Sequence, residues 1–249
     1  MTDLSAETVV VTGASRGLGA SMARRLAREG ANVVLSARDE DALRSVADGL
    51  ADAPGETLVT PADVTDEAAV EALVAGTLEA FDGLTGLVNN AGVGMLSLHD
   101  ELRDTANVDA DDWRLILEVN LTGAFLCAKH AVPHMVEAGR GNVVNVSSGL
   151  GRRAAAGWGP YVASKWGLEG FSRTLADEVE ADGVNVNCLD PGGRAATGFW
   201  DHLLEDERED VLPPDVMDDA AALLLAQGPD GVTRESLTAE EWEERLRDA

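Results

Sequence analysis

The chain has 249 residues, of which 45% are hydrophobic, so it can bury a full core and we expect a single domain over residues 1–249. Its formal net charge is −26, from 45 acidic and 19 basic residues, which argues against partners such as nucleic acid or an anionic membrane. The first residues carry no basic segment, and no stretch approaches the roughly 18 apolar residues of a membrane span, so we expect a cytoplasmic protein.

Short β-branched runs alternate with amphipathic stretches along the first half of the chain. The pattern predicts strands at residues 8–11, 31–35, 57–60 and 86–89, and helices at residues 18–28, 40–50 and 66–80. A strand followed by a helix, repeated several times, is typical of a parallel sheet.

A glycine-rich turn, Thr12-Gly13-Ala14-Ser15-Arg16-Gly17-Leu18-Gly19, separates the first strand from the first helix. Glycines allow a tight turn and a close approach of the backbone to a pyrophosphate, which the N-terminus of the helix attracts. After the second strand, an enzyme that uses NAD would carry a carboxylate for the ribose, but this chain has Arg38. Arg38 and Arg16 both suit a 2′-phosphate, so we predict NADP rather than NAD. The simpler alternative places both arginines at the solvated surface.

The second half continues the alternation. We expect helices at about residues 113–135 and at residues 160–180, and strands at residues 142–146 and 184–189. The whole pattern predicts an α/β fold with a doubly wound parallel β-sheet and helices on both faces, the Rossmann fold, in which ligands bind at the carboxyl ends of the strands.

Tyr161 and Lys165 are four residues apart on an expected helix, so they share one face. A nearby cation lowers the pKa of a phenol toward neutrality, which makes Tyr161 a candidate general acid. Tyr161 is the only tyrosine of the chain and Lys165 one of its two lysines, so a chance pairing at this spacing is improbable.

Two segments near the C-terminus complete the expected elements. Residues 193–214 are expected to form a long substrate loop, with Phe199 and Trp200 as its apolar wall. Thr238 and Glu241 form a capping-box pattern, which predicts a short terminal helix at about residues 239–248.

The motifs together resemble those of the short-chain dehydrogenase/reductase family, over about residues 7–192. The residues that carry the resemblance are the turn from Thr12 to Gly19, Asn89-Asn90-Ala91-Gly92, Asn120, Ser148, and Tyr161 to Lys165. The resemblance implies four catalytic residues: Ser148 polarises a carbonyl, Tyr161 transfers a proton, Lys165 orients the ribose, and Asn120 holds a water in the proton relay. Ser148 is chosen over Ser147 because its spacing to Tyr161 matches that of the family.

The turn itself and the resemblance also predict a set of cofactor-binding residues. These are Gly13, Ser15, Arg16, Gly17, Leu18, Gly19, Arg38, Asp63, Val64, Asn90, Ala91, Gly92, Tyr161, Lys165, Pro191 and Gly192.

Two departures from the family pattern stand near the C-terminus. Thr197 lies one residue later after Pro191-Gly192 than the family's threonine, which leaves its cofactor role open. Residues 231–237 and the capped helix replace the family's usual terminal strand. We expect a homo-oligomer, and the unusual C-terminus leaves dimer and tetramer as alternatives.

The expected function is transfer of a hydride between NADP and a small carbonyl or secondary alcohol, such as a ketone, a sugar or a 3-ketoacyl thioester. The alternative is a redox sensor or scaffold that binds NADP without turnover. Four histidines and two cysteines show no ligand or disulfide spacing, so no metal is expected. The scarcity of lysine beside so much acid indicates adaptation to a high-salt cytoplasm, with a merely well-solvated surface as the alternative.

Overall fold

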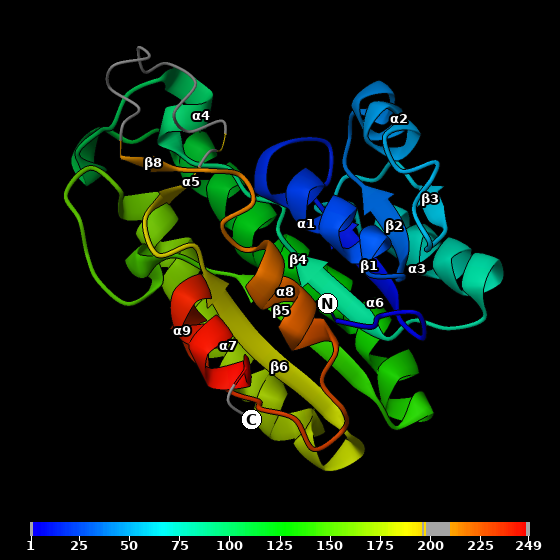
Figure 1. The fold of residues 1–249 in the computed structure, drawn as a ribbon. Coiled ribbons are helices and arrows are strands. Elements are labelled where there is room, and N and C mark those ends of the chain that lie inside the picture. Colours follow the sequence, from blue (N-terminus) through cyan, green and yellow to red (C-terminus); the bar gives the residue numbers. More distant parts are fainter. Residues whose placement is uncertain (1, 196, 198–209, 248–249) are drawn as a thin grey trace.

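The computed structural model describes residues 2–195, 197 and 210–247 (Figure 1). A seven-stranded sheet with the order β3-β2-β1-β4-β5-β6-β9 lies at its centre, and all its strand pairs are parallel. Its strands are β1 (Thr8–Thr12), β2 (Asn32–Ser36), β3 (Thr57–Val59), β4 (Gly86–Asn89), β5 (Gly141–Val146), β6 (Val184–Asp190) and β9 (Ser236–Thr238). The strand order reverses between β1 and β4, as in a doubly wound sheet, so the expected fold class is confirmed.

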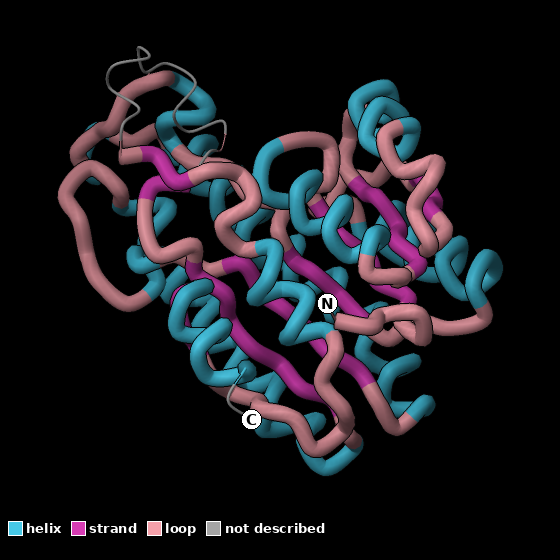
Figure 2. Tube along the Cα trace, in the orientation of Figure 1, coloured by secondary structure: helices cyan, strands magenta, loops and turns pink. Residues whose placement is uncertain are grey.

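Helices cover both faces of this sheet (Figure 2). One face packs against α1 (Gly17–Arg28), α2 (Glu40–Asp48), α8 (Asp218–Leu225) and α9 (Ala239–Arg247). The other face packs against α3 (Glu67–Phe81), α6 (Gly123–Ala138) and α7 (Gly159–Val179). Because β1, β4, β5 and β6 are covered on both sides, every one of their residues is buried, which explains their near-continuous apolar runs.

Side-chain caps set the starts of several helices. Asp39 accepts a hydrogen bond from the backbone N–H of Ala42 at the start of α2, and Asp66 accepts one from Ala68 at the start of α3, both at 3.0 Å. At α9, the side chains of Thr238 and Glu241 each accept a bond from the other's backbone N–H, which is the expected capping box.

Two elements near the C-terminus differ from expectation. The terminal strand is present: β9 pairs in parallel with Cys188–Asp190 of β6, so its expected replacement by residues 231–237 was wrong. The helix α8, which the sequence analysis did not assign, packs against α1 and α9. Trp242 of α9 is fully buried and donates from Nε1 to the carbonyl of Cys188 at 2.9 Å, so α9 holds β9 against the sheet edge.

The helical run over residues 110–138 comprises α5 (Ala110–Leu117), a π-helical turn (Glu118–Thr122) and α6. By length and composition alone it could cross a membrane, but half of its apolar window is buried against the rest of the chain. Core helices of soluble proteins meet the same criterion, so this is weak evidence for a span.

Of the expected substrate loop, residues 193–195, 197 and 210–214 lie within the described residues. There, β7 (Arg194–Ala195) pairs in parallel with β8 (Val211–Leu212). The expected apolar wall, Phe199 and Trp200, lies outside the described residues.

Candidate active site

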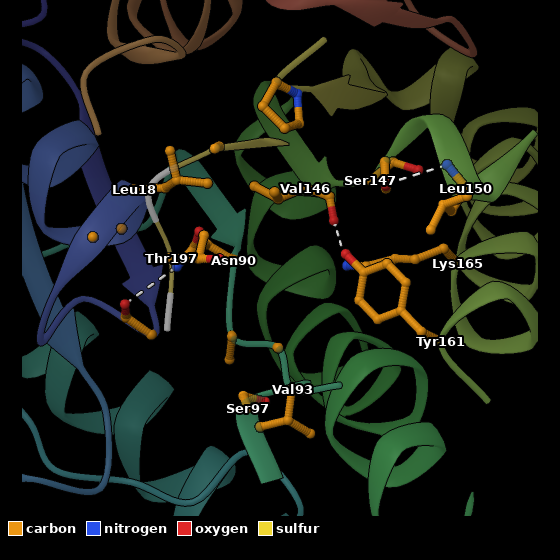
Figure 3. Close-up of a pocket in the computed structure, with 18 of the residues that line it drawn as sticks. Leu18, Asn90, Val93, Ser97, Val146, Ser147, Leu150, Tyr161, Lys165 and Thr197 are labelled. Carbon is orange, nitrogen blue, oxygen red and sulfur yellow. Dashed lines mark hydrogen bonds between the residues drawn. The ribbon is translucent and has the colours of Figure 1, made fainter. Parts of the chain in front are cut away.

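A pocket of about 1990 Å³ opens at the carboxyl ends of the central strands. Every expected cofactor residue lines it, as do Ser148 and Thr197, and several of them are drawn in Figure 3. Asn120 is the exception among the expected site residues, because it does not line the pocket. The fold thus brings residues from the first turn, the ends of later strands and α7 to one cavity.

The glycine-rich turn is shaped by close contact with the segment after β4. Gly13 has a φ of +65°, and a Cβ there would lie 2.8 Å from Asn90 Nδ2 and 2.9 Å from Ala91 Cα. A Cβ at Gly19 would clash with the Gly13 carbonyl and the Asn90 side chain. These glycines therefore permit the turn to pack against residues 90–91.

Asn90 braces this turn with its side chain. Its Nδ2 donates to the carbonyls of Thr12 at 2.9 Å and Gly13 at 3.2 Å, while its backbone N–H donates to Thr12 Oγ1 at 3.0 Å. Both amide hydrogens of Asn90 thus have protein partners. Its contribution to the cofactor site is to fix the turn.

The N-terminus of α1 has the features of an anion site. Arg16 occupies the N-cap position without a side-chain capping bond, and the first turn contains no acidic residue. The N-termini of α2 and α3, in contrast, are capped by Asp39 and Asp66. The first N–H groups and the positive end of the α1 dipole therefore face the pocket, and no side chain of the first turn supplies an anion to them, which fits the phosphates of a dinucleotide.

Arg38 and Asp63, which follow β2 and β3, line the same pocket. Burial raises the pKa of Asp63, but hydrogen bonds from Thr65 and the charge of Arg38 outweigh it, so the pKa is lowered overall. The Asp63 carboxylate is therefore held by Thr65, and the Arg38 guanidinium stays on the pocket wall, where it can meet a 2′-phosphate.

Tyr161 and Lys165 lie one turn apart on α7, beside the end of β5 (Figure 3). Lys165 is buried, and its Nζ donates to the carbonyl of Val146 at 2.7 Å and lies 5.7 Å from the centre of the Tyr161 ring. Burial lowers the pKa of Lys165 to about 8, against the opposing charges of Glu169 and Asp190.

The expected lowering of the Tyr161 pKa was wrong for this arrangement. Burial raises the pKa of Tyr161 above its ordinary value, the carboxylate of Asp190 raises it further, and a hydrogen bond with Ser148 only partly opposes them. Desolvation of the phenolate thus outweighs the nearby ammonium.

Asn120 lies behind the pocket, in the π-helical turn between α5 and α6. Its Oδ1 accepts from the backbone N–H of Val93 at 2.8 Å, and its Nδ2 donates to the Val93 carbonyl at 2.9 Å and to Ser164 Oγ at 3.0 Å. Its side chain joins the loop after β4 to α7, so Asn120 positions the two segments that carry the pocket.

The sequence analysis missed a buried charge network beside Ser148. Arg152 donates to Glu169 Oε1 at 3.2 Å and to Asp190 Oδ2 at 2.6 Å, and Ser147 Oγ donates to Glu169 Oε1 at 2.6 Å. Both carboxylates are almost fully buried. The arginine pair at positions 152 and 153, soon after Ser148, was the available signal. Ser147, which the sequence analysis did not choose as the catalytic serine, belongs to this network.

No group of three or more histidine, cysteine or carboxylate side chains in the described part of the chain could hold a metal ion.

Comparisons with known proteins agree with this geometry. The family model for short chain dehydrogenases matches residues 7–208. The cis-4-hydroxycyclohexanecarboxylate dehydrogenase of Sinomonas cyclohexanicum is 42% identical over 185 residues, which cover 74% of this chain and 71% of that protein. A 3-oxoacyl-[acyl-carrier-protein] reductase of Synechocystis is 36% identical over 195 residues, with coverage of 77% and 76%.

Solved structures also match over nearly the whole length. A metagenomic short-chain oxidoreductase in complex with NADP has a TM-score of 0.81 at 35% identity, covering 94% of this chain and 97% of the other. Carveol dehydrogenase from Mycobacterium avium, in complex with NAD, has a TM-score of 0.86 at 25% identity, covering 96% and 97%. Similar folds thus occur with either nicotinamide cofactor.

Proposed function

The chain belongs to the short-chain dehydrogenase/reductase family and is an NAD(P)-dependent oxidoreductase that acts on alcohol or carbonyl groups, and on that premise we propose that it uses NADP to interconvert a small carbonyl compound and its alcohol. The observation that carries the proposal is the meeting of Ser148, Tyr161 and Lys165 with Arg16 and Arg38 in one pocket.

The preference for NADP rests on charge. Arg16 and Arg38 line the adenosine end of the pocket, and residue 38 is an arginine where an NAD enzyme would present a carboxylate. A guanidinium binds a phosphate through two parallel hydrogen bonds. The bound nicotinamide supplies the hydride donor or acceptor.

The proposed roles of the chain's own residues follow from their positions. Ser148, in hydrogen bond with Tyr161, orients the substrate oxygen, and Tyr161 donates a proton to it. A raised pKa keeps the phenol protonated at neutral pH, which is the form that a general acid needs. Lys165, held on the carbonyl of Val146, binds the ribose hydroxyls. Asn120 supports this arrangement from behind.

The proposed substrate is a free small molecule. Arg173, near the end of α7, is outnumbered by Asp177, Glu178, Glu180 and Asp182, and this acidic cluster would repel an acidic carrier protein. Among the relatives, the hydroxycyclohexanecarboxylate dehydrogenase bears the name of a small cyclic alcohol with a carboxylate. A ketone, a sugar or a CoA thioester would avoid the repulsion of a carrier.

We also propose a cytoplasmic, salt-adapted single domain that assembles as a homo-oligomer. Leu115, Phe125 and Trp166 are 40%, 44% and 52% exposed on α5, α6 and α7, and large exposed apolar side chains on neighbouring helices suit a contact with a second copy.

Tyr161→Phe tests the proposal. The variant should lose at least about 100-fold in kcat, because general acid catalysis is worth about 10²–10⁴-fold, while its NADPH affinity stays close to that of the parent. NADPH oxidation with a panel of ketones, sugars and acyl-CoA thioesters measures turnover, and NADPH fluorescence measures binding. A parent protein that binds NADPH but oxidises it with no carbonyl compound would support the sensor alternative instead.

A further inference from the structure

Arg153 lies in the loop between β5 and α7 and lines the catalytic end of the pocket. An atom at the Cβ position of Gly149 would lie 3.5 Å from Arg153 Nε and 3.6 Å from Arg153 Nη2, so the guanidinium lies against Gly149. Gly149 directly follows Ser148, and consecutive Cα atoms are about 3.8 Å apart. A cation therefore lies next to the residue that orients the substrate oxygen.

The neighbouring arginine has a different role. Arg152 binds Glu169 and Asp190, so its charge is balanced by two buried carboxylates. Asp190 Oδ2 lies 3.7 Å from the same Cβ position of Gly149, but the Asp190 carboxylate is paired with Arg152. Arg153 has no hydrogen-bond or ion-pair partner within residues 2–195, 197 and 210–247.

In a chain where carboxylates outnumber basic side chains by 45 to 19, Arg103, for example, has three acidic partners, whereas Arg153 has none among the described residues. Four apolar residues, Leu150, Ala154, Ala155 and Trp158, line the same cavity, together with Ser148 and the Asp190 carboxylate that Arg152 binds. Apolar surface beside a guanidinium fits an organic acid that has a hydrocarbon body, because the guanidinium matches a carboxylate through two hydrogen bonds.

We propose that the substrate is a carbonyl or hydroxy compound with a carboxylate a few bonds from the reacting carbon, and that Arg153 binds that carboxylate. This inference rests on the proposed function and names the substrate class of the same site. Arg153 positions the substrate so that its carbonyl meets Ser148 and Tyr161. The anion that Arg153 binds is the substrate's own carboxylate, which distinguishes this class from thioesters, whose phosphates lie far from the carbonyl.

Matched pairs of acids and neutral esters test the inference. We would measure kcat/KM with NADPH for 3-oxobutanoate and 4-oxocyclohexanecarboxylate, for the methyl ester of each, and for acetoacetyl-CoA. The parent should prefer the acids. Arg153→Ala should lower kcat/KM for an acid by about 10–100-fold, because a hydrogen bond to a charged group contributes about 1.5–3 kcal/mol, and should leave the ester within about threefold. Arg153→Lys should recover part of the loss.

Arg28→Ala is the matched control, because Arg28 is exposed on α1 and its loss changes the net charge equally. Calorimetry of the NADP⁺-loaded parent and Arg153→Ala proteins with cyclohexanecarboxylate and cyclohexanecarboxamide gives a readout independent of turnover. Three results would overturn the inference: an equal loss of kcat/KM for acid and ester in Arg153→Ala, a parent protein that prefers the esters or acetoacetyl-CoA, or equal affinity of both proteins for cyclohexanecarboxylate. The proposed function would still stand in each case if the parent reduced ketones with NADPH. A parent that oxidises NADPH with no carbonyl compound would instead contradict the proposed function, and the calorimetry would still decide the role of Arg153.

Discussion

Tyr161 and Lys165 show how burial sets the protonation states of this site. Desolvation raises the pKa of the phenol and lowers that of the ammonium to about 8, so both shifts favour the neutral forms. At pH 7 the Tyr161 phenol keeps its proton, and Lys165 remains mostly charged because this pH is below its pKa of about 8. The pair is therefore set for proton donation from Tyr161 beside a cation that can hold ribose hydroxyls.

Arg38→Ala should weaken binding of NADPH selectively. The variant loses charge-assisted hydrogen bonds to the 2′-phosphate, so the KM for NADPH should rise by about 10–100-fold while that for NADH changes by less than about threefold. Steady-state kinetics with both cofactors measures the effect. Arg44→Ala is the control, because Arg44 is an exposed residue of α2 that pairs with Glu40. A parent protein that used both cofactors equally well would contradict the prediction.

Individual site residues differed in how far the sequence could reveal them. Tyr161 and Lys165 were accessible because a four-residue helical spacing places them on one face. The bonds of Arg152 to Glu169 and Asp190 join a loop, the middle of α7 and the end of β6, and no local pattern encodes such a meeting. Likewise, the position of Asn90 was predictable, but its use in bracing the turn depends on tertiary contact with Gly13.

At the scale of elements, the central strands and the long helices up to residue 190 followed their periodicity, and the capping box predicted α9, whereas α8 and β9 were not predicted. The α8 helix has eight residues, of which the last six are alanine or leucine, so it offers no polar face from which a period could be recognised. The β9 strand has only three residues, and its pairing with β6 depends on the burial of Trp242 from α9. Both elements are defined by packing rather than by local pattern.

The buried carboxylate of Asp218, at the start of α8, destabilises the folded state when it is ionised. Its Oδ2 accepts from Ser21 Oγ of α1 at 2.9 Å, but its Oδ1 is buried without a hydrogen-bond partner among the described residues. Burial, aided by Asp215, raises its pKa from 3.8 to about 6. Between about pH 4 and pH 6 the folded state therefore binds more protons than the unfolded state, so the contribution of this group to stability falls as pH rises.

Asp218→Asn should raise the Tm at pH 7. An amide can keep the bond from Ser21 and removes the buried charge, and a gain of about 1 kcal/mol corresponds to about 2–4 °C for a protein of this size. The gain should shrink as the pH is lowered through 6 toward 4, because the parent carboxylate then becomes neutral too. Thermal unfolding of both proteins across this range gives the comparison. Asp219→Asn is the control: Asp219 pairs with Arg25 and Arg247, so its loss should give no gain. A gain independent of pH would contradict the assignment.

For the molecule as a whole, the excess of carboxylates is the dominant electrostatic feature. The net charge of −26 is spread over one globular fold, and many basic side chains already pair with an acidic one, so most of the remaining carboxylates repel each other across the surface. The negative electrostatic potential of this surface repels anions in general. Recognition of an anionic cofactor or substrate therefore depends on arginines within the pocket rather than on long-range attraction.

Salt should stabilise the folded protein, and the shape of its effect should reveal the cause. The Debye length falls from about 30 Å at 0.01 M to about 10 Å at 0.1 M and about 3 Å at 1 M, so screening of surface repulsion acts mainly at low salt. Strengthened burial of apolar groups by excluded solutes, in contrast, builds up at molar concentrations. We expect the Tm to rise steeply between 0.01 M and about 0.3 M potassium chloride and more gently above it. Salt also weakens the ion pairs, but 45 acidic against 19 basic residues make repulsion the larger contribution.

Calorimetric scans over this potassium chloride series, with trimethylamine N-oxide as an uncharged stabiliser for comparison, measure the effect of salt on the Tm. A Tm that rose only above about 1 M would show that screening is not the cause, and a Tm independent of salt would contradict adaptation to a high-salt cytoplasm.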